Sequence, residues 1–191
     1  MTRRLVYLVA KTADGFIARG DGRLDGFLAQ GEHIIDLCRT FPETLPGHLR
    51  ESLGVSGPNQ RFDTVLMGRR TYLPALDLGI ASPYPHLRQI VFSRTLPARN
   101  DPNLVVVAAD PLATVRQLKS EPGRDVWLCG GAELAATLFP EIDELILKIH
   151  PVMFGAGIPL FAWAVDPTRF SLVQSRQFAN GFIQLHYERL P

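Results

Sequence analysis

Three segments of the chain place glycine, arginine or hydroxyl side chains directly after a short apolar run. They are Gly68-Arg69-Arg70-Thr71, Ser93-Arg94 and Gly130-Gly131-Ala132-Glu133-Leu134. Guanidinium groups match phosphate oxygens in shape and charge, and glycines at a helix start leave backbone N–H groups open to an anion. Each motif by itself also fits a tight structural turn or a solvated basic turn. Parallel strands would bring all three to one sheet edge, where a nucleotide with several phosphates would contact them together.

Short apolar runs alternate with helix-like segments along the chain, which is typical of α/β proteins. Such a fold contains the parallel strands that would bring the three segments to one edge. Most runs are almost continuously apolar, as expected for strands covered on both faces. The last two runs, Phe170–Phe178 and Phe182–Arg189, flank Asn180-Gly181, a pair suited to a two-residue type I′ turn. We therefore predict a mixed, mostly parallel sheet flanked by helices that ends in an antiparallel hairpin. The earlier runs are Leu5–Ala10, Thr64–Met67, Gln89–Phe92, Leu104–Val107, Val126–Cys129 and Leu145–Ile149.

Helix signals lie between these runs. Asp110-Pro111 predicts a helix start, because aspartate caps free N–H groups and proline suits the first helical turn. A second helix is expected after Cys129. The region Gly26–Phe62 is the least regular, with three prolines dividing short helical pieces. Because no linker or repeat interrupts the pattern, we expect one domain over residues 1–191.

Composition excludes several classes of protein. The 191 residues include 20 basic and 19 acidic side chains, so the chain lacks the clustered basic excess that nucleic-acid binding requires. Two separated cysteines, Cys38 and Cys129, argue against a disulfide framework. The five histidines show no metal-ligand spacing, and no apolar run approaches the length of a membrane span. We expect a cytoplasmic protein without a metal.

Five motifs follow one another in a fixed order: Ala10-Lys11-Thr12-Ala13-Asp14-Gly15-Phe16-Ile17-Ala18, Met67-Gly68-Arg69-Arg70-Thr71-Tyr72, Ser93-Arg94, the paired-glycine segment, and Pro151–Phe161, which reads Pro-x3-Gly-x-Gly-x-Pro-Leu-Phe. In this order they resemble the dihydrofolate reductase superfamily. The likeness is greatest to the branch that includes the C-terminal reductase domain of the riboflavin-synthesis deaminase-reductase. It runs from Leu5 to about Tyr187 and is weakest over Gly26–Phe62.

The resemblance implies NADPH as the cofactor. It implies that Ala10 and Ile17 line the nicotinamide, that Gly68-Arg69-Arg70-Thr71 with Ser93 and Arg94 hold the adenosine end, and that Gly130-Gly131-Ala132-Glu133-Leu134 lies over the pyrophosphate. It also implies a cis peptide bond between the paired glycines. Relatives in this branch commonly form homodimers, and the apolar segment Pro159–Val165 fits either such a contact or the core.

The catalytic residues are less clear from the sequence. True dihydrofolate reductases carry an acid on the helix after the loop that covers the nicotinamide, and the stretch Gly26–Gln30 has no counterpart. Asp14, Asp25 and Lys148 are the candidates for supplying a proton. Asp14-Gly15 is also typical of a turn, and we favour the turn. Lys148 replaces a threonine of the dihydrofolate enzymes and would either orient an anionic or carbonyl-bearing substrate or point to solvent.

These features predict an NADPH-dependent oxidoreductase that transfers a hydride to a small molecule, such as a pyrimidine or pterin-like compound. Two alternatives stay open. One is a module that binds NADPH as a sensor without turnover, and the other is a true dihydrofolate reductase. The substrate pocket is expected between the first strand, the Gly26–Phe62 region and the strand that contains Lys148.

Overall fold

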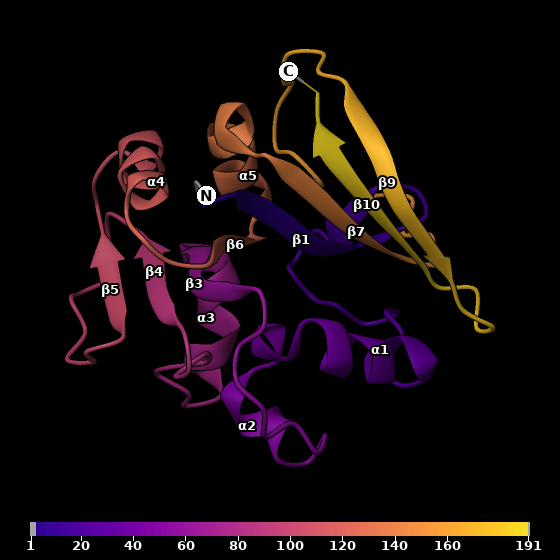
Figure 1. Cartoon of the computed structure of the whole chain (residues 1–191), viewed down its shortest axis with the longest axis horizontal. Coiled ribbons are helices and arrows are strands. Elements are labelled where there is room, and N and C mark those ends of the chain that lie inside the picture. Colours follow the sequence, from indigo (N-terminus) through magenta and orange to yellow (C-terminus); the bar gives the residue numbers. More distant parts are fainter. Residues whose placement is uncertain (1–2, 191) are drawn as a thin grey trace.

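A computed structural model describes residues 3–190 of the chain, and its centre is an eight-stranded sheet (Figure 1). The strand order is β5-β4-β3-β6-β1-β7-β10-β9, and every neighbouring pair from β5 to β7 is parallel. Strand β10 runs antiparallel to both β7 and β9. The predicted mostly parallel sheet with a C-terminal antiparallel hairpin is confirmed. Its strands are β1 (Leu5–Thr12), β3 (Phe62–Gly68), β4 (Arg88–Phe92), β5 (Leu104–Val107), β6 (Asp125–Gly130), β7 (Glu144–His150), β9 (Phe170–Gln177) and β10 (Ile183–Arg189).

Helices cover both faces of the sheet. Side chains alternate between faces along a strand, so Leu5 and Tyr7 of β1 pack on one side while Val6 and Leu8 pack on the other. Helices α4 (Pro111–Ser120) and α5 (Ala132–Leu138) cover the first side. Helices α1 (Glu32–Thr40) and α3 (Arg69–Asp77) cover the second (Figure 1). The continuous apolar character of the strands follows from this double burial.

Between β2 (Phe16–Ala18) and β3 the Gly26–Phe62 region forms the short helical pieces that its prolines indicate. After α1 come a 3-10 turn over Pro42–Thr44 and the short helix α2 (Gly47–Arg50). The predicted cap of α4 is confirmed, since the Asp110 carboxylate accepts a hydrogen bond from the Leu112 N–H at 3.0 Å. No helix among residues 3–190 is both long and apolar enough to cross a lipid bilayer.

The turn between β9 and β10 differs from the prediction. A type I′ turn needs positive φ at both Asn180 and Gly181, but only Gly181 has it, with φ +82°. Phe178 and Phe182 close a three-residue loop instead, through a 3.0 Å hydrogen bond from the Phe178 N–H to the Phe182 carbonyl. The prediction of a two-residue type I′ turn is wrong because Asn180 does not adopt the positive φ that this turn needs; its side-chain oxygen accepts a hydrogen bond from the Phe182 N–H within the loop.

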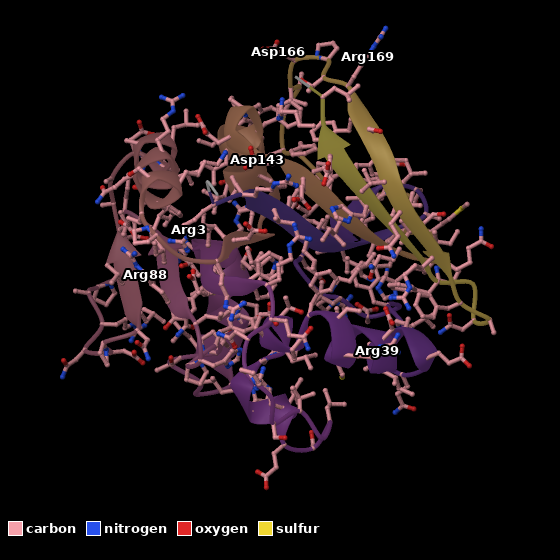
Figure 2. All side chains as sticks on the ribbon, in the orientation of Figure 1. Arg3, Arg39, Arg88, Asp143, Asp166 and Arg169 are labelled. Atoms are coloured by element: carbon pink, nitrogen blue, oxygen red, sulfur yellow. The ribbon has the colours of Figure 1, made fainter. Side chains whose placement is uncertain are left out.

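The apolar segment Pro159–Val165 packs on the core in part. Leu160, Phe161 and Val165 contact the cluster beneath α4 and α5, whereas Trp163 is half-exposed. Charged side chains such as Asp166 and Arg169 project from the loop before β9 (Figure 2). The homodimer that the resemblance implies stays a prediction.

Candidate active site

The three motifs that the sequence predicts to bind an anion meet at one edge of the sheet. Strand β3 lies between β4 and β6, and all three run parallel. Their carboxyl ends therefore place Gly68, Ser93 and Gly130 side by side, as the sequence predicts. We call these ends and the residues that follow them the glycine–arginine edge: Gly68, Arg69, Arg70, Thr71, Ser93, Arg94, Gly130, Gly131, Ala132, Glu133 and Leu134.

Within this edge the glycines are packed closely against Thr71. A Cβ atom built on Gly131 would lie 3.3 Å from Thr71 Oγ1, and one built on Gly68 would lie 3.5 Å from the Gly131 nitrogen. The peptide bond between Gly130 and Gly131 is cis, as the family resemblance led us to expect. Side chains at these positions would fill the space in which the backbone could approach a phosphate group, so the residues present fit a dinucleotide.

The charged groups of the edge differ in their partners. Arg70 lies 3.3 Å from Glu133, so this exposed ion pair connects the first turns of α3 and α5. Arg69 and Arg94 are exposed and have no ion-pair partner within residues 3–190. The Ser93 hydroxyl accepts hydrogen bonds from the N–H groups of Thr95 and Leu96. Two guanidinium groups of this edge are thus available to an anion.

The loop after β1 is held in place by Asp14. Its carboxylate accepts a hydrogen bond from the Thr12 hydroxyl and two more from the N–H groups of Phe154 and Gly155, at 3.0 and 2.7 Å. These hydrogen bonds lower the pKa of Asp14, and the bond from Thr12 has the largest effect. A carboxylate that accepts several hydrogen bonds is a poor proton donor at neutral pH. The structure therefore favours the structural interpretation of Asp14.

Two short strands that the sequence did not reveal continue this loop. Strand β2 (Phe16–Ala18) pairs with β8 (Ile158–Pro159), so the predicted nicotinamide-lining residue Ile17 is connected to the Pro151–Phe161 motif. Ile17 is partly buried against the core. Strand β2 also contacts β1, the strand that contains Ala10.

On the other side of Ala10 is a cavity. Ala10 faces Lys148 across the β1–β7 pair, and Lys148 faces Gln184 across the β7–β10 pair. The cavity lies between these strands and α1, and we call it the α1 cavity. Its lining consists of His33, Ile34, Leu37, Lys148, His150, Phe182 and Gln184. It occupies the predicted position between the Gly26–Phe62 region and the strand of Lys148, but β10 rather than β1 supplies the third wall.

Two histidines of the cavity have defined tautomers. His150 Nδ1 accepts a hydrogen bond from the Leu28 N–H at 3.0 Å, so its proton lies on Nε2. His33 accepts at Nδ1 from the Asn180 amide and donates from Nε2 to the Leu28 carbonyl. Burial, followed by the charges of Lys148 and His33, lowers the pKa of His150 to about 4. At neutral pH His150 is a neutral hydrogen-bond donor.

Of the three catalytic candidates, Lys148 alone lines this cavity. Burial lowers the pKa of Lys148. Asp25 lies on the loop before α1, exposed and paired with Arg19 at 2.9 Å. The acid of α1, Asp36, is buried, but it does not line the cavity, and Arg39 and Arg176 hold its oxygens at 2.9 and 2.5 Å.

Comparison with known proteins identifies the family. The family model of the RibD C-terminal domain matches residues 3–184. The chain belongs to the RibD C-terminal domain family. Two Bacillus subtilis proteins described as uncharacterized are similar over nearly their whole length. YwjB is 32% identical over 99% of both chains, and YyaP is 29% identical over 97% of this chain and 94% of its own.

Solved structures share the fold of this RibD C-terminal domain. A Shewanella sp. PV-4 protein named for riboflavin biosynthesis matches over 100% of both chains, with a TM-score of 0.72 and 20% identity. A diaminohydroxyphosphoribosylaminopyrimidine deaminase/5-amino-6-(5-phosphoribosylamino)uracil reductase from Thermotoga maritima matches 99% of this chain and 57% of its own, with a TM-score of 0.67 and 15% identity. The predicted dihydrofolate-reductase-like fold of the riboflavin type is therefore confirmed.

In this RibD C-terminal domain, sequence reasoning missed His33, Phe182 and Gln184 as cavity residues. His33 and Leu37 lie one helical turn apart in α1, and that spacing could have indicated a shared face. No local pattern distinguishes Gln184 from other polar residues of β10. Its role depends on the register that places it beside Lys148.

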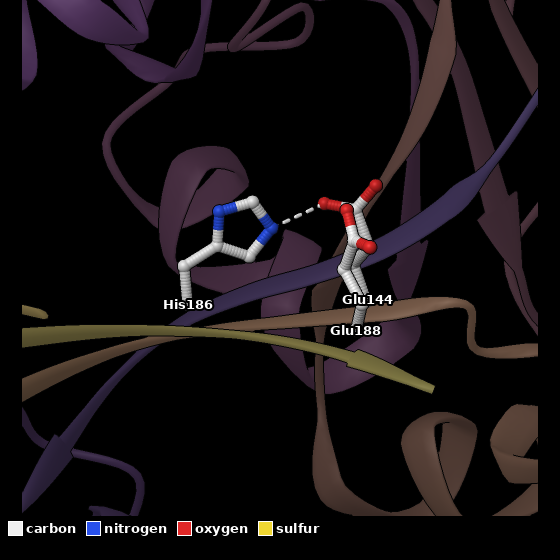
Figure 3. Close-up of side chains that lie close together, drawn as sticks. All are labelled: Glu144, His186 and Glu188. Carbon is white, nitrogen blue, oxygen red and sulfur yellow. Dashed lines mark hydrogen bonds and ion pairs between the residues drawn. The ribbon is translucent and has the colours of Figure 1, made fainter. Parts of the chain in front are cut away.

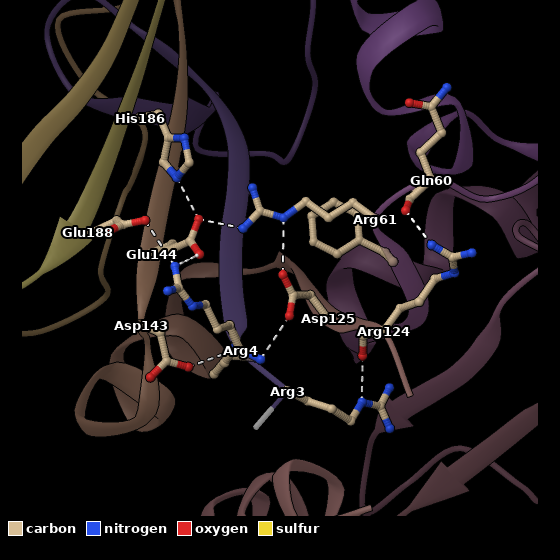
Figure 4. Close-up of polar contacts among 12 residues, drawn as sticks. Arg3, Arg4, Gln60, Arg61, Arg124, Asp125, Asp143, Glu144, His186 and Glu188 are labelled. Carbon is tan, nitrogen blue, oxygen red and sulfur yellow. Dashed lines mark hydrogen bonds and ion pairs between the residues drawn. The ribbon is translucent and has the colours of Figure 1, made fainter. Parts of the chain in front are cut away.

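A second polar cluster lies at the opposite end of β7. Glu144, His186 and Glu188 approach one another closely enough for a metal ion (Figure 3). However, the buried Glu144 carboxylate already forms ion pairs with the guanidinium groups of Arg4 and Arg61, with N···O distances of 2.6 and 2.5 Å (Figure 4). Burial raises the pKa of Glu144, but hydrogen bonds from His186, Arg4 and Arg61 outweigh burial and lower it to about 2. Guanidinium groups occupy the positions that a cation would need, which indicates a structural network.

Proposed function

We propose that this protein is an NADPH-dependent reductase that transfers a hydride to a small-molecule substrate bound in the α1 cavity. One relationship carries the proposal. Strand β1 lies between β6, whose end belongs to the glycine–arginine edge, and β7, which lines the cavity and pairs with β1 at Ala10. A nicotinamide at Ala10 would therefore be joined to the phosphate-binding edge on one side and to Lys148 on the other.

Particular residues would hold the cofactor. Arg69 and Arg94 are available for the 2′-phosphate, and this favours NADPH over NADH because guanidinium groups pair strongly with phosphate. Gly130 and Gly131 leave the backbone open to the pyrophosphate. The loop fastened by Asp14 would exclude water from the nicotinamide face. When bound, NADPH supplies the hydride, and the protein orients the reacting carbon.

Two observations bear on the identity of the substrate: the name of one relative and the side chains that line the cavity. The Thermotoga maritima relative is named as a uracil reductase, which supports a pyrimidine-type substrate. Among residues 3–190 no carboxylate lines the α1 cavity, and this does not favour a true dihydrofolate reductase, in which an acid assists reduction of the pterin. Lys148 is the candidate that remains close to the reacting atoms. We propose that it orients the substrate or supplies the proton.

The proposal is tested by titrating the full chain with NADPH and NADH and following nicotinamide fluorescence. We expect NADPH to bind more tightly than NADH. Charge reversal at both Arg69→Glu and Arg94→Glu should weaken NADPH binding by about 100-fold, because two charge-assisted contacts are lost. Arg116→Glu, an exposed change on α4, is the matched control. Absence of NADPH binding, or indifference to both edge substitutions, would contradict the proposal.

Turnover is measured separately as NADPH oxidation with pyrimidine, pterin and quinone compounds. Oxidation with one class would identify the reductase reaction. Tight NADPH binding without oxidation across all classes would favour the sensor alternative. The two measurements therefore separate a cofactor-binding module from an enzyme.

A further inference from the structure

The segment Arg19–Gln30 lies between β2 and α1, and we call it the latch segment. It contains no helix or strand, and apart from Arg19, Phe27 and Leu28 all its residues are exposed. Within residues 3–190, its hydrogen bonds to groups outside the segment are both made by the main chain of Leu28. Segments with few buried contacts open at a low cost in free energy. The contacts of Phe27 and Leu28 therefore decide whether this segment stays closed.

Two histidines from different elements hold Leu28. The Leu28 N–H donates to His150 Nδ1 at 3.0 Å, and the Leu28 carbonyl accepts from His33 Nε2 at 3.2 Å. The Phe27 ring also stacks on the His150 ring, with 4.6 Å between the centroids. His33 belongs to α1, and His150 is the last residue of β7. The latch segment is thus fastened both to the helix and to the sheet that enclose the α1 cavity.

The same two histidines line the α1 cavity. The cavity has a volume of about 30 Å³, close to the share of one water molecule in the liquid. A substrate ring cannot enter while these walls stay in place. Because the rings of His33 and His150 border the cavity and also bind Leu28, release of the latch segment would free two walls of the cavity together.

The loop between β9 and β10 controls one of these bonds. Asn180 Nδ2 donates to His33 Nδ1 at 2.9 Å, so the proton of a neutral His33 lies on Nε2, where it reaches the Leu28 carbonyl. The Asn180 amide is itself oriented, because its oxygen accepts from the Phe182 N–H. Gly31 allows this close approach, since a Cβ atom there would lie 2.8 Å from Asn180 Nδ2. Asn180 is therefore a positioning residue that acts on the latch segment through His33.

We infer that the latch segment is a gate of the α1 cavity, which opens when His33 and His150 release Leu28 and which Asn180 holds closed through His33. The inference deepens the proposed function and rests on it for its role in catalysis, because a substrate would enter the cavity through this gate. The motion itself requires neither cofactor nor substrate. It can therefore be measured in the free protein.

Amide hydrogen exchange of the full chain, followed by NMR without ligand, tests the coupling. Asn180→Ala removes the donor to His33 but leaves the bond between the Leu28 N–H and His150 in place. We expect the Leu28 N–H to exchange about tenfold faster in this variant, equal to about 1.4 kcal/mol. Asn59→Ala removes an amide donor in a different loop and should leave the exchange of Leu28 unchanged. Unchanged Leu28 exchange in Asn180→Ala would overturn the inference.

Opening of the cavity is measured by reductive methylation with formaldehyde, followed by peptide mass spectrometry. The chain has three lysines, Lys11, Lys119 and Lys148, of which Lys148 lines the cavity. We expect Lys148 to react several-fold faster in Asn180→Ala than in the wild type, while the other two lysines keep their rates. An unchanged rate at Lys148, or an equal increase at all three lysines, is incompatible with a gate at this cavity.

A second variant is used if Asn180→Ala does not fold. His33→Phe retains a ring that can stack on Phe182, as His33 does at 4.4 Å between centroids, but removes the nitrogen that binds the Leu28 carbonyl. It should increase both the exchange of the Leu28 N–H and the methylation rate of Lys148, and wild-type rates would overturn the inference. NADPH titration of the same samples reports on the proposed function separately, since the gate can open in a protein that binds no cofactor.

Discussion

Asp36 and Arg176 form an ion pair that fastens helix α1 to strand β9, with 2.5 Å between the carboxylate and the guanidinium. Asp36 is 5% exposed, so loss of its partner leaves a buried charge uncompensated. Arg176→Met should lower the free energy of unfolding by about 2 kcal/mol. Arg39→Met removes the exposed partner of the same carboxylate and should cost less than about 1 kcal/mol. Urea denaturation of both variants measures the difference, and equal losses would contradict it.

Asp14 should act by positioning the covering loop. Asp14→Ala removes the acceptor for the Phe154 and Gly155 N–H groups, so NADPH affinity should fall several-fold while the pH dependence of turnover stays unchanged. Asp21→Ala, which removes another exposed loop carboxylate, is the control. A shifted pH profile in Asp14→Ala would instead indicate a proton-transfer role.

Gly157 is tightly packed against β2. A Cβ atom at this position would overlap the Ala18 carbonyl oxygen. Gly157→Ala should therefore displace the β2–β8 pair and increase hydrogen exchange over residues 13–18. Gly20→Ala places its Cβ in open space and should change nothing. Unchanged exchange in Gly157→Ala would show that the loop adjusts without cost.

Glu144 should dominate acid destabilisation. Its pKa is lowered from 4.5 to about 2 in the folded protein, so its stabilisation is complete above pH 4.5 and is lost as pH falls towards 2. The loss amounts to about 3 kcal/mol. In Glu144→Gln the unfolding free energy should be lower and should vary less over this interval. Glu188→Gln, which removes the more exposed carboxylate beside Arg4, should retain most of the wild-type dependence.

His150 should remain neutral well below the usual histidine range. Because burial lowers its pKa from 6.5 to about 4, the unfolded chain binds a proton that the folded protein does not between these values. Stability contributed by this group therefore decreases as pH falls from 6.5 to 4. NMR titration of labelled histidines should show one resonance that titrates near pH 4 and disappears in His150→Asn. The exposed His48→Asn should leave that resonance in place.

Local sequence determined the elements and one edge of the site. The apolar runs predicted six of the strands to within a few residues, because doubly covered strands must be apolar throughout. The polar residues that end β3, β4 and β6 were predicted to meet because parallel strands end at the same edge, and Gly68, Ser93 and Gly130 do so.

Tertiary structure alone decided which side chains surround the α1 cavity. Lys148 was visible as a candidate, but His33 and Gln184 join it through the packing of α1 and the register of β10, and neither is encoded by a local pattern. Likewise, Asp14 and Asp25 looked equivalent as carboxylates until their partners were known. Periodicity follows from the chain's own geometry, whereas burial, register and hydrogen-bond partners depend on residues far away in the sequence.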